Sequence, residues 1–263
     1  MNRSSALVTG ASSGIGETFS RRLSAMGFRL ILVARRKQRL EKLAAELPDA
    51  QVIPADLTIE SDLRTVEARI ATTPDLEFLV NNAGFGVHGV FSESDIEAQD
   101  RMHRLHIIAT ERLTHAALKG MKARALGNII NVSSVAGFFA TPFNVSYCAT
   151  KSWINSFTEG IYLELKSLHS PVRVQALCPG FTYTEFHDVL GMERSSIPSF
   201  LWMSAEKVVH SSLRGLDHNR LFVIPGWRYR IFIAVFRWFP RALKHHLAIR
   251  YSRIANDALR MTN

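Results

Sequence analysis

The chain reads Thr9-Gly10-Ala11-Ser12-Ser13-Gly14-Ile15-Gly16 directly after the apolar pair Leu7-Val8. Glycines at this place permit a tight turn and let the backbone approach a pyrophosphate, for which a helix start offers free N–H groups. Apolar residues then recur at helical spacing from Ile15 to Met26. The spacing departs from GxGxxG, but the strand, glycine turn and helix together predict a loop that binds a dinucleotide phosphate.

Strand and helix patterns alternate along the rest of the chain. The expected strands cover residues 7–9, 29–34, 51–55, 76–80, 128–132, 172–177 and 221–224. The expected helices cover residues 15–26, 37–47, 61–71, 95–122, 146–168 and 205–215. Such alternation predicts an α/β fold, in which a doubly wound parallel sheet carries helices on both faces.

Length and composition favour one globular domain. The 263 residues are 47% hydrophobic and 21% charged, which is an ordinary balance for a folded chain. Cys148 and Cys178 are too few for a disulfide framework and lack metal-ligand spacing, so we expect reduced thiols, no metal and a cytoplasmic location. No secretory signal and no long apolar run is visible, so a spanning helix is not expected.

The positive charge is concentrated at the C-terminal end. Of the net +9, residues 219–263 carry +8, from nine basic residues and one acid, Asp257. A nucleic-acid footprint over the whole protein is therefore not expected. We divide the chain into a dinucleotide-binding domain, residues 1–226, and a basic, aromatic extension, residues 227–263.

Within this extension an apolar stripe recurs at helical spacing between arginines. It consists of Ile231, Phe232, Val235, Phe236 and Phe239, flanked by Arg230, Arg237 and Arg241. The stripe is too short to span a bilayer but suits a peripheral contact with an anionic membrane surface. Packing on its own domain or on another subunit is an equally simple explanation, and the sequence leaves the alternatives open.

The end of the second strand selects the cofactor. Folds that select NAD place an acid there for the ribose 2′-hydroxyl, whereas this chain reads Ala34-Arg35-Arg36. A guanidinium suits a 2′-phosphate, through forked and charge-assisted hydrogen bonds. We therefore expect NADP(H), with Arg35 favoured over Arg36 as the phosphate ligand. The alternative, that both are solvated charges before a helix, stays open.

Three polar residues suggest acid–base chemistry. Tyr147 and Lys151 lie four apart on an expected helix and therefore share a face. A nearby ammonium favours a phenolate, which lowers the pKa of a tyrosine from its ordinary value near 10. Ser134 follows a buried strand, where its hydroxyl is placed to polarise a carbonyl.

The order and spacing of these motifs resemble the classical short-chain dehydrogenase/reductases. The resemblance rests on Thr9–Gly16, Asn81-Asn82-Ala83-Gly84, Ser134, Tyr147–Lys151 and Pro179-Gly180, and it covers residues 6–224. It implies a Rossmann-type fold, a homodimer or homotetramer, and an oxidoreductase that moves a hydride between a nicotinamide and a carbonyl or alcohol. Tyr147 would be the acid/base, Lys151 would bind the nicotinamide ribose and lower the Tyr147 pKa, and Ser134 would orient the substrate.

The resemblance also implies the cofactor contacts. The expected cofactor-binding residues are Gly10, Ser12, Ser13, Gly14, Ile15, Gly16, Arg35, Asp56, Leu57, Asn82, Ala83, Gly84, Tyr147, Lys151, Pro179, Gly180, Thr182 and Thr184.

One position departs from the family pattern. Where these enzymes carry an asparagine that holds a proton-relaying water, alignment places His106. A histidine can also hold a water, and its ring can titrate. Two interpretations stay open: His106 takes part in the relay, or it is a tolerated helix residue. The departure also suggests an alternative function, a catalytically weak NADP-binding sensor or scaffold, which the intact Ser134, Tyr147 and Lys151 disfavour.

The substrate is expected to be apolar. Residues 185–204 lie where the family has its substrate lid and carry the apolar residues Phe186, Val189, Leu190, Phe200, Leu201 and Trp202. A second group is placed to reach the same cleft: Phe85, Val87, Phe138, Phe139 and Phe181. Packing within the core explains any one of them equally well.

Overall fold

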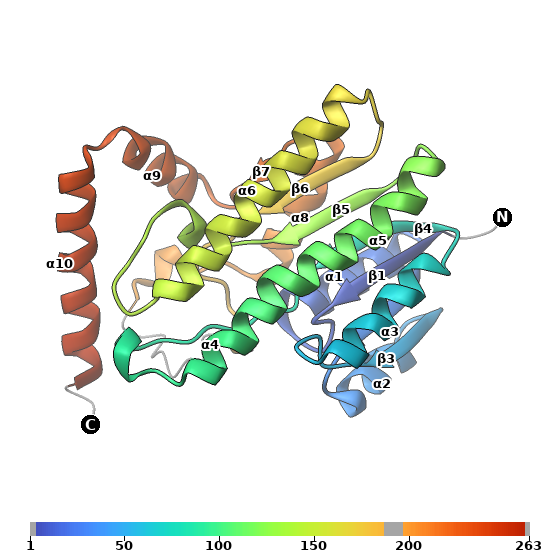
Figure 1. Cartoon of the computed structure of the whole chain (residues 1–263), viewed down its shortest axis with the longest axis horizontal. Coiled ribbons are helices and arrows are strands. Elements are labelled where there is room, and N and C mark those ends of the chain that lie inside the picture. The colour runs from blue at the N-terminus through green and yellow to red at the C-terminus, as the bar shows by residue number, and fades with distance from the viewer. Residues whose placement is uncertain (1–3, 187–196, 261–263) are drawn as a thin grey trace.

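The computed structural model of the chain describes residues 4–186 and 197–260, with side chains described up to Arg250. Seven parallel strands form one sheet in the order β3-β2-β1-β4-β5-β6-β7 (Figure 1). The strands are β1 Ser5–Thr9, β2 Arg29–Ala34, β3 Ala50–Pro54, β4 Leu76–Asn81, β5 Asn128–Val132, β6 Arg173–Leu177 and β7 Phe222–Val223. The predicted doubly wound α/β fold is confirmed.

Helices cover both faces of the sheet. The helices are α1 Gly14–Ala25, α2 Lys37–Ala45, α3 Glu60–Ala71, α4 Ile96–His103, α5 Thr110–Ala123, α6 Val145–Ser167, α8 Ala205–Asp217, α9 Trp227–Trp238 and α10 Arg241–Arg260. Ala6 and Val8 of β1 pack in one buried cluster with α1, α2 and α8, whereas Leu7 packs in the other with α3, α5 and α6. The central strands β1, β4, β5 and β6 are almost wholly buried because helices cover them on both sides, whereas the edge strand β3 is only partly buried.

The carboxyl ends of the strands meet at one edge of the sheet. The glycine turn follows β1, Asn82 follows β4, Ser134 follows β5 and Pro179 follows β6. The strand order changes direction between β1 and β4, which is where parallel α/β sheets open a ligand crevice. Motifs distant in the sequence are therefore brought to one edge.

The segment predicted as one helix over residues 95–122 is interrupted. A π-helical turn, Arg104–Ala109, separates α4 from α5. Such turns hold one extra residue and occur mostly at functional sites. His106 lies inside this turn and is buried. The apolar periodicity continues through the turn, so the pattern gave no sign of it.

The C-terminal extension forms two helices, of which the sequence pattern indicated only the first. The face of α9 that packs inward carries Tyr229 and Ile233, with Phe236 partly covered. From the predicted stripe, Ile231 and Val235 instead lie exposed. The inward face is thus rotated from the predicted stripe, because Tyr229 and Ile233 have contacts on the domain. No helix in the described part of the chain is long and apolar enough to cross a membrane.

Candidate active site

The turn after β1 requires glycine at two places. Gly10 has a φ of +65°, and a Cβ there would lie 2.7 Å from Asn82 Nδ2. A Cβ on Gly16 would overlap the carbonyl oxygen of Gly10, so α1 starts in close contact with the turn. The end of β4 braces the turn, since Asn82 Nδ2 donates to the Thr9 carbonyl at 3.0 Å and Asn82 N to Thr9 Oγ1 at 2.9 Å. The backbone therefore stays open to a close ligand.

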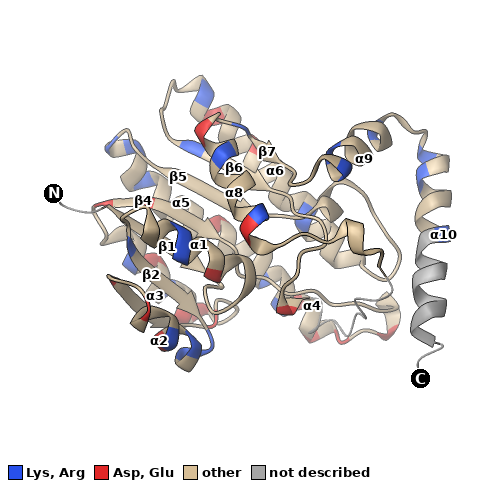
Figure 2. Cartoon of the chain, turned by 180° about the vertical axis from the view of Figure 1, so that it is seen from behind, with Lys and Arg blue, Asp and Glu red and all other residues tan. Residues whose placement is uncertain are grey.

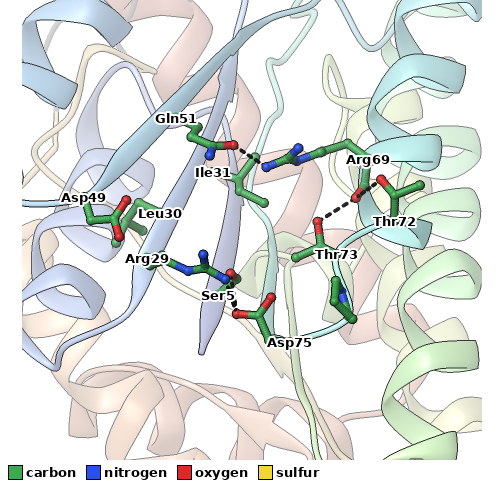
Figure 3. A pocket seen from close by; sticks show the side chains of 11 residues that line it. Ser5, Arg29, Leu30, Ile31, Asp49, Gln51, Arg69, Thr72, Thr73 and Asp75 are labelled. Atoms are coloured by element: carbon green, nitrogen blue, oxygen red, sulfur yellow. Dashed lines mark hydrogen bonds and ion pairs between the residues drawn. The ribbon is translucent and has the colours of Figure 1, made fainter. Parts of the chain in front are cut away.

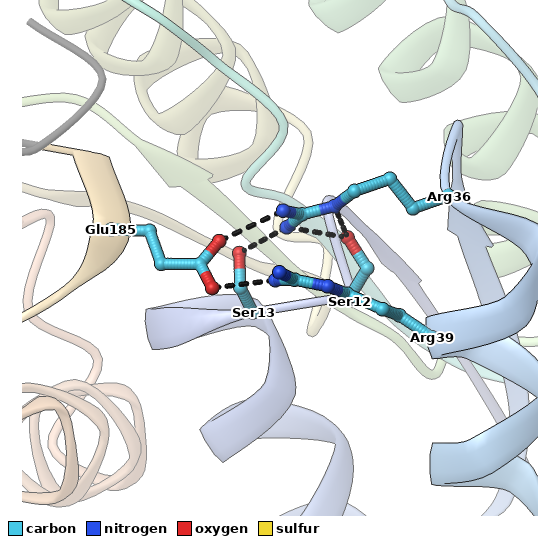
Figure 4. A network of polar contacts seen from close by, with 5 residues as sticks. All are labelled: Ser12, Ser13, Arg36, Arg39 and Glu185. Carbon is cyan, nitrogen blue, oxygen red and sulfur yellow. Dashed lines mark hydrogen bonds and ion pairs between the residues drawn. The ribbon is translucent and has the colours of Figure 1, made fainter.

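A cluster of cations lies beside this turn. We call Arg36, Arg39, Ser12 and Ser13 the arginine cradle (Figure 4). Arg36 Nη2 donates to Ser13 Oγ at 2.8 Å, and Arg36 Nη1 and Arg39 Nη1 bind the two carboxylate oxygens of Glu185 at 2.8 and 2.5 Å. These hydrogen bonds to Arg36 and Arg39 lower the pKa of Glu185. The cradle thus holds a carboxylate beside the glycine turn.

The neighbouring arginine points elsewhere. The Arg35 side chain is 68% exposed, and its nearest acid is Asp56, at 3.7 Å. The structure therefore brings Arg36, rather than the favoured Arg35, against the glycine turn. The sequence reasoning also missed Arg39 and Glu185. Arg39 had a readable signal, because it lies three residues after Arg36 at the start of a helix and shares its side.

Three predicted catalytic residues come together where β5 and α6 meet. Tyr147 and Lys151 lie on α6, and Lys151 Nζ is 5.7 Å from the centre of the Tyr147 ring. Lys151 Nζ donates to the Val132 carbonyl at 3.0 Å, in the last residue of β5. Ser134 follows two residues later, near enough to the Tyr147 phenol to act against the rise in its pKa. The serine hydroxyl and the phenol can therefore bind one substrate oxygen together.

Burial governs the proton affinities of this group. It raises the pKa of Tyr147 to about 12, against the opposing hydrogen bond from Ser134. It also lowers the pKa of Lys151 to about 8. The Lys151 ammonium is directed at the Val132 carbonyl, and desolvation is the largest influence on the Tyr147 pKa. The phenol is accordingly protonated at neutral pH. The lowering of this pKa by Lys151 together with a nicotinamide ring stays a prediction.

His106 lies directly against α6, the helix that carries Tyr147 and Lys151. Its Nδ1 is 2.9 Å from Thr150 Oγ1, and its ring centre is 6.0 Å from that of Tyr147. The Thr150 hydroxyl gives its one proton to the Tyr147 carbonyl at 2.9 Å, so it accepts from His106 Nδ1–H. Burial, followed by the charge of Lys151, lowers the His106 pKa well below its usual value. The ring is therefore neutral, with the lone pair on Nε2.

That lone pair is buried without a hydrogen-bond partner among the described residues. It is directed at Gly84, where a Cβ would lie 2.8 Å from Nε2. Buried polar atoms are nearly always hydrogen-bonded to protein or ordered water, so an unpaired nitrogen beside Tyr147 indicates a position for a polar group.

The remaining predicted cofactor residues fall into two groups. Thr184 lies against the turn, because a Cβ on Gly14 would be 2.8 Å from Thr184 Cγ2. Gly180 lies under the ring of Tyr229 from α9. In contrast, the Leu57 side chain is buried in the core beside α3, and the Asp56 carboxylate accepts from Thr58 N at 3.0 Å. The contacts of Asp56 and Leu57 with the cofactor therefore stay a prediction.

Two aromatic rings contact the catalytic group. The Phe186 ring centre is 5.9 Å from that of Tyr147, and the Phe85 ring centre is 6.3 Å from that of His106. Other rings predicted near the cleft pack elsewhere: Phe138 on Phe222, Phe139 on α9, and Phe181 on Trp202. Residues 187–196 of the predicted lid, with Val189 and Leu190, lie outside the described residues.

A separate pocket of about 120 Å³ opens at the other edge of the sheet, at the amino ends of β1, β2 and β3 (Figure 3). Its polar side chains pair with one another: Arg29 with Asp75 at 2.5 Å, and Arg69 with Gln51. None of the predicted catalytic or cofactor-binding residues lines this pocket. Among the described residues, no group of histidine, cysteine or acidic side chains is arranged to hold a metal ion.

Comparison with known proteins agrees with this geometry. Residues 4–194 match the family described as short chain dehydrogenase. The chain is 29% identical over 243 residues to a very-long-chain 3-oxoacyl-CoA reductase of Anas platyrhynchos, covering 86% of this chain and 75% of the relative.

Two solved structures extend the likeness over nearly the whole fold. A short-chain dehydrogenase from Sphingobium yanoikuyae in complex with NADPH is 33% identical, with a TM-score of 0.81 and coverage of 89% of this chain and 93% of that one. A bulky-bulky ketone specific alcohol dehydrogenase from Comamonas testosteroni is 31% identical, with a TM-score of 0.77 and coverage of 92% and 97%. The chain therefore belongs to the short-chain dehydrogenase/reductase family of nicotinamide-dependent oxidoreductases.

Proposed function

We propose that the protein is an NADP(H)-dependent reductase or dehydrogenase of apolar ketones and secondary alcohols, with Tyr147 as its acid/base. The observation that carries the proposal is the meeting of Tyr147, Lys151 and Ser134 at the carboxyl edge of the sheet. A bound nicotinamide supplies the hydride for reduction of the carbonyl carbon and accepts it in the reverse direction.

The arginine cradle supports the preference for the phosphorylated cofactor. A site that already binds the Glu185 carboxylate through Arg36 and Arg39 offers a 2′-phosphate the same donors and two positive charges. The glycine turn, with Gly10 at positive φ against Asn82, offers the pyrophosphate a backbone without side chains. Arg36 reaches both sites through its bonds to Ser12 and Ser13.

Tyr147 provides the proton in the direction of reduction. With a pKa of about 12, its phenol stays protonated at neutral pH and can donate to the carbonyl oxygen as negative charge develops there. Ser134 donates a second hydrogen bond to the same oxygen and stabilises that charge. Oxidation reverses the transfer, and the phenol oxygen then needs a nearby cation, which Lys151 provides.

His106 is proposed as a positioning residue. Its ring holds Thr150 by a 2.9 Å hydrogen bond, one turn of α6 from Tyr147 and next to Lys151. Its Nε2 lone pair can accept a hydrogen bond from a water on the path by which Lys151 is reprotonated. This role corresponds to the relay asparagine that the family resemblance led us to expect.

The apolar substrate class is supported by the rings around the phenol. Phe186 and Phe85 flank Tyr147 and His106, so a ligand carbonyl at Tyr147 lies among aromatic surfaces. The similar Comamonas enzyme is named for bulky ketones, in line with such a site.

The test is turnover with purified protein, NADPH and a panel of bulky ketones and small polar ketones. The proposal expects NADPH oxidation with bulky ketones and loss of that activity in Tyr147→Phe. NADPH binding without turnover on any carbonyl would instead favour a sensor or scaffold.

A further inference from the structure

The structure assigns the outward face of α9, with the first turns of α10, as a docking surface for an anionic lipid bilayer close to the catalytic edge of the sheet. Outward apolar residues recur on α9 at Trp227, Ile231, Val235 and Trp238, on one side of the helix. Trp227 is 58% exposed and Trp238 is 89% exposed. Large indoles are rarely left in water this fully unless they contact something.

Basic residues border this apolar face on both sides. At 100° per residue, Arg228 falls on one border, while Arg230 and Arg237 fall on the other. Arg241 and Lys244 follow at the start of α10, next to the exposed Leu243. An apolar centre between arginines is typical of helices that lie in a membrane interface, where long cations reach the headgroups.

The surrounding sequence offers these charges no counter-ion. No acid occurs between Asp217 and Asp257, a stretch that contains seven arginines and one lysine. Figure 2 shows blue segments along α9 and the described part of α10, which project from the body of the domain. Charge complementarity therefore favours an anionic partner. In a symmetric contact with a second copy, the same arginines would oppose one another.

The inward face of α9 packs on the loops that follow β5 and β6, so the docking surface lies near the proposed active site. The Tyr229 hydroxyl accepts from Phe181 N at 3.1 Å and donates to the Leu201 carbonyl at 2.7 Å, and its ring covers Gly180. Phe232 and Phe236 pack on Phe139, in the loop after Ser134. A bilayer on the outward face would therefore lie close to the catalytic edge. This placement rests on the proposed function and suits an apolar substrate that partitions into lipid.

The experiment measures binding of the full-length protein to vesicles of phosphatidylcholine alone or mixed with phosphatidylglycerol, by co-sedimentation at low and high salt. We expect binding to the anionic vesicles, weakened by salt. The pair Arg230→Gln and Arg237→Gln should lower the partition coefficient about 30-fold, at about 1 kcal/mol per basic residue. Arg22→Gln, an exposed arginine on α1, is the matched control and should bind like the parent.

The apolar part is tested separately. Ile231→Ser with Trp238→Ser should likewise weaken binding, whereas Leu163→Ser, at a similarly exposed position on α6, should leave it unchanged. Turnover of a water-soluble ketone should be the same in all these variants, which separates this proposal from the reaction itself. Equal binding of the parent and the α9 variants, or no binding together with dissociation of an oligomer by those variants, would overturn it.

Discussion

Glu185 Oε2 lies 2.8 Å from Arg36 Nη1, so the enzyme's own carboxylate occupies the basic site that we assign to the cofactor phosphate. A phosphate that enters this site must displace the carboxylate. Glu185→Gln keeps the shape and removes the charge, and should therefore tighten NADPH binding by about two- to fivefold, as expected for a surface ion pair. Fluorescence titration measures the dissociation constant.

NADH, which lacks the phosphate, should bind Glu185→Gln and the parent equally. Glu46→Gln, which breaks a similar exposed ion pair with Arg21, is the control and should change neither constant. If NADPH instead binds Glu185→Gln more weakly than the parent, the carboxylate clamps the bound cofactor and does not compete with it.

The two adjacent arginines should differ in importance. Arg36→Ala should weaken NADPH binding by about tenfold or more, because hydrogen bonds to a charged group contribute about 1.5–3 kcal/mol. Arg35→Ala should have a smaller effect, because Arg35 faces Asp56. Comparing NADPH and NADH constants for both variants checks this. The reverse ranking would restore Arg35 as the phosphate ligand.

Tyr147→Phe should lower turnover by about 10²-fold or more, since it removes the proposed proton donor and keeps the ring. NADPH affinity should be preserved, because the phosphate contacts lie elsewhere. Tyr162→Phe, on the same helix, serves as the control. Steady-state rates with a reactive ketone decide the matter, and substantial residual turnover would assign the proton transfer to another group.

His106 should make the stability of the folded protein depend on pH. A buried neutral ring with a lowered pKa must stay unprotonated in the folded protein, whereas the unfolded chain binds a proton below about pH 6.5. Stability should therefore fall as pH drops through 6.5, and His106→Asn should lessen this loss. Thermal unfolding between pH 5 and 8 measures it.

The same position should affect the rate. His106→Asn should preserve turnover if it holds the same water, whereas His106→Leu should lower turnover and alter the pH–rate profile. Identical profiles for the parent and both variants would leave His106 a purely structural residue.

Lys151 should lower the stability of the folded protein at neutral pH, although turnover requires it. Its pKa of about 8 lies below the usual value of about 10.5, so Lys151 loses its proton at a lower pH in the folded protein than in the unfolded chain. Stability contributed by this group therefore rises as pH increases from 8 to 10.5. Lys151→Met should be more stable than the parent at pH 7, with a gap that narrows toward pH 10, and should be nearly inactive. A constant gap across this range would contradict the assigned pKa.

Much of the fold was predictable because its signals are local. Alternating apolar runs and helical stripes identified the sheet and its helices, and the turn at Gly10 depends on nearby backbone geometry. The π-helical turn that carries His106 was not predictable, because the apolar periodicity continues through it unchanged.

The direction of individual side chains could not be predicted from the sequence either. Arg35 and Arg36 are chemically identical, and only the path of the chain after β2 decides which of them meets Ser13. The inward face of α9 was missed for a related reason. Tyr229 faces inward because its hydroxyl hydrogen-bonds the backbone of Phe181 and Leu201, which are distant in the sequence. The spacing of apolar residues along α9 carries no information about such contacts.

The extra residue in the π-helical turn gives this stretch of the chain an unusual tolerance of a change in length. Deleting one residue between Arg104 and Ala109 would let the helix close into regular α geometry without breaking it. The helices α4 and α5 would then keep their present alignment, whereas the same deletion in a regular α-helix rotates one half by about 100° relative to the other. The effect of a one-codon deletion here would be confined to the turn itself, where the His106 ring faces that of Tyr147.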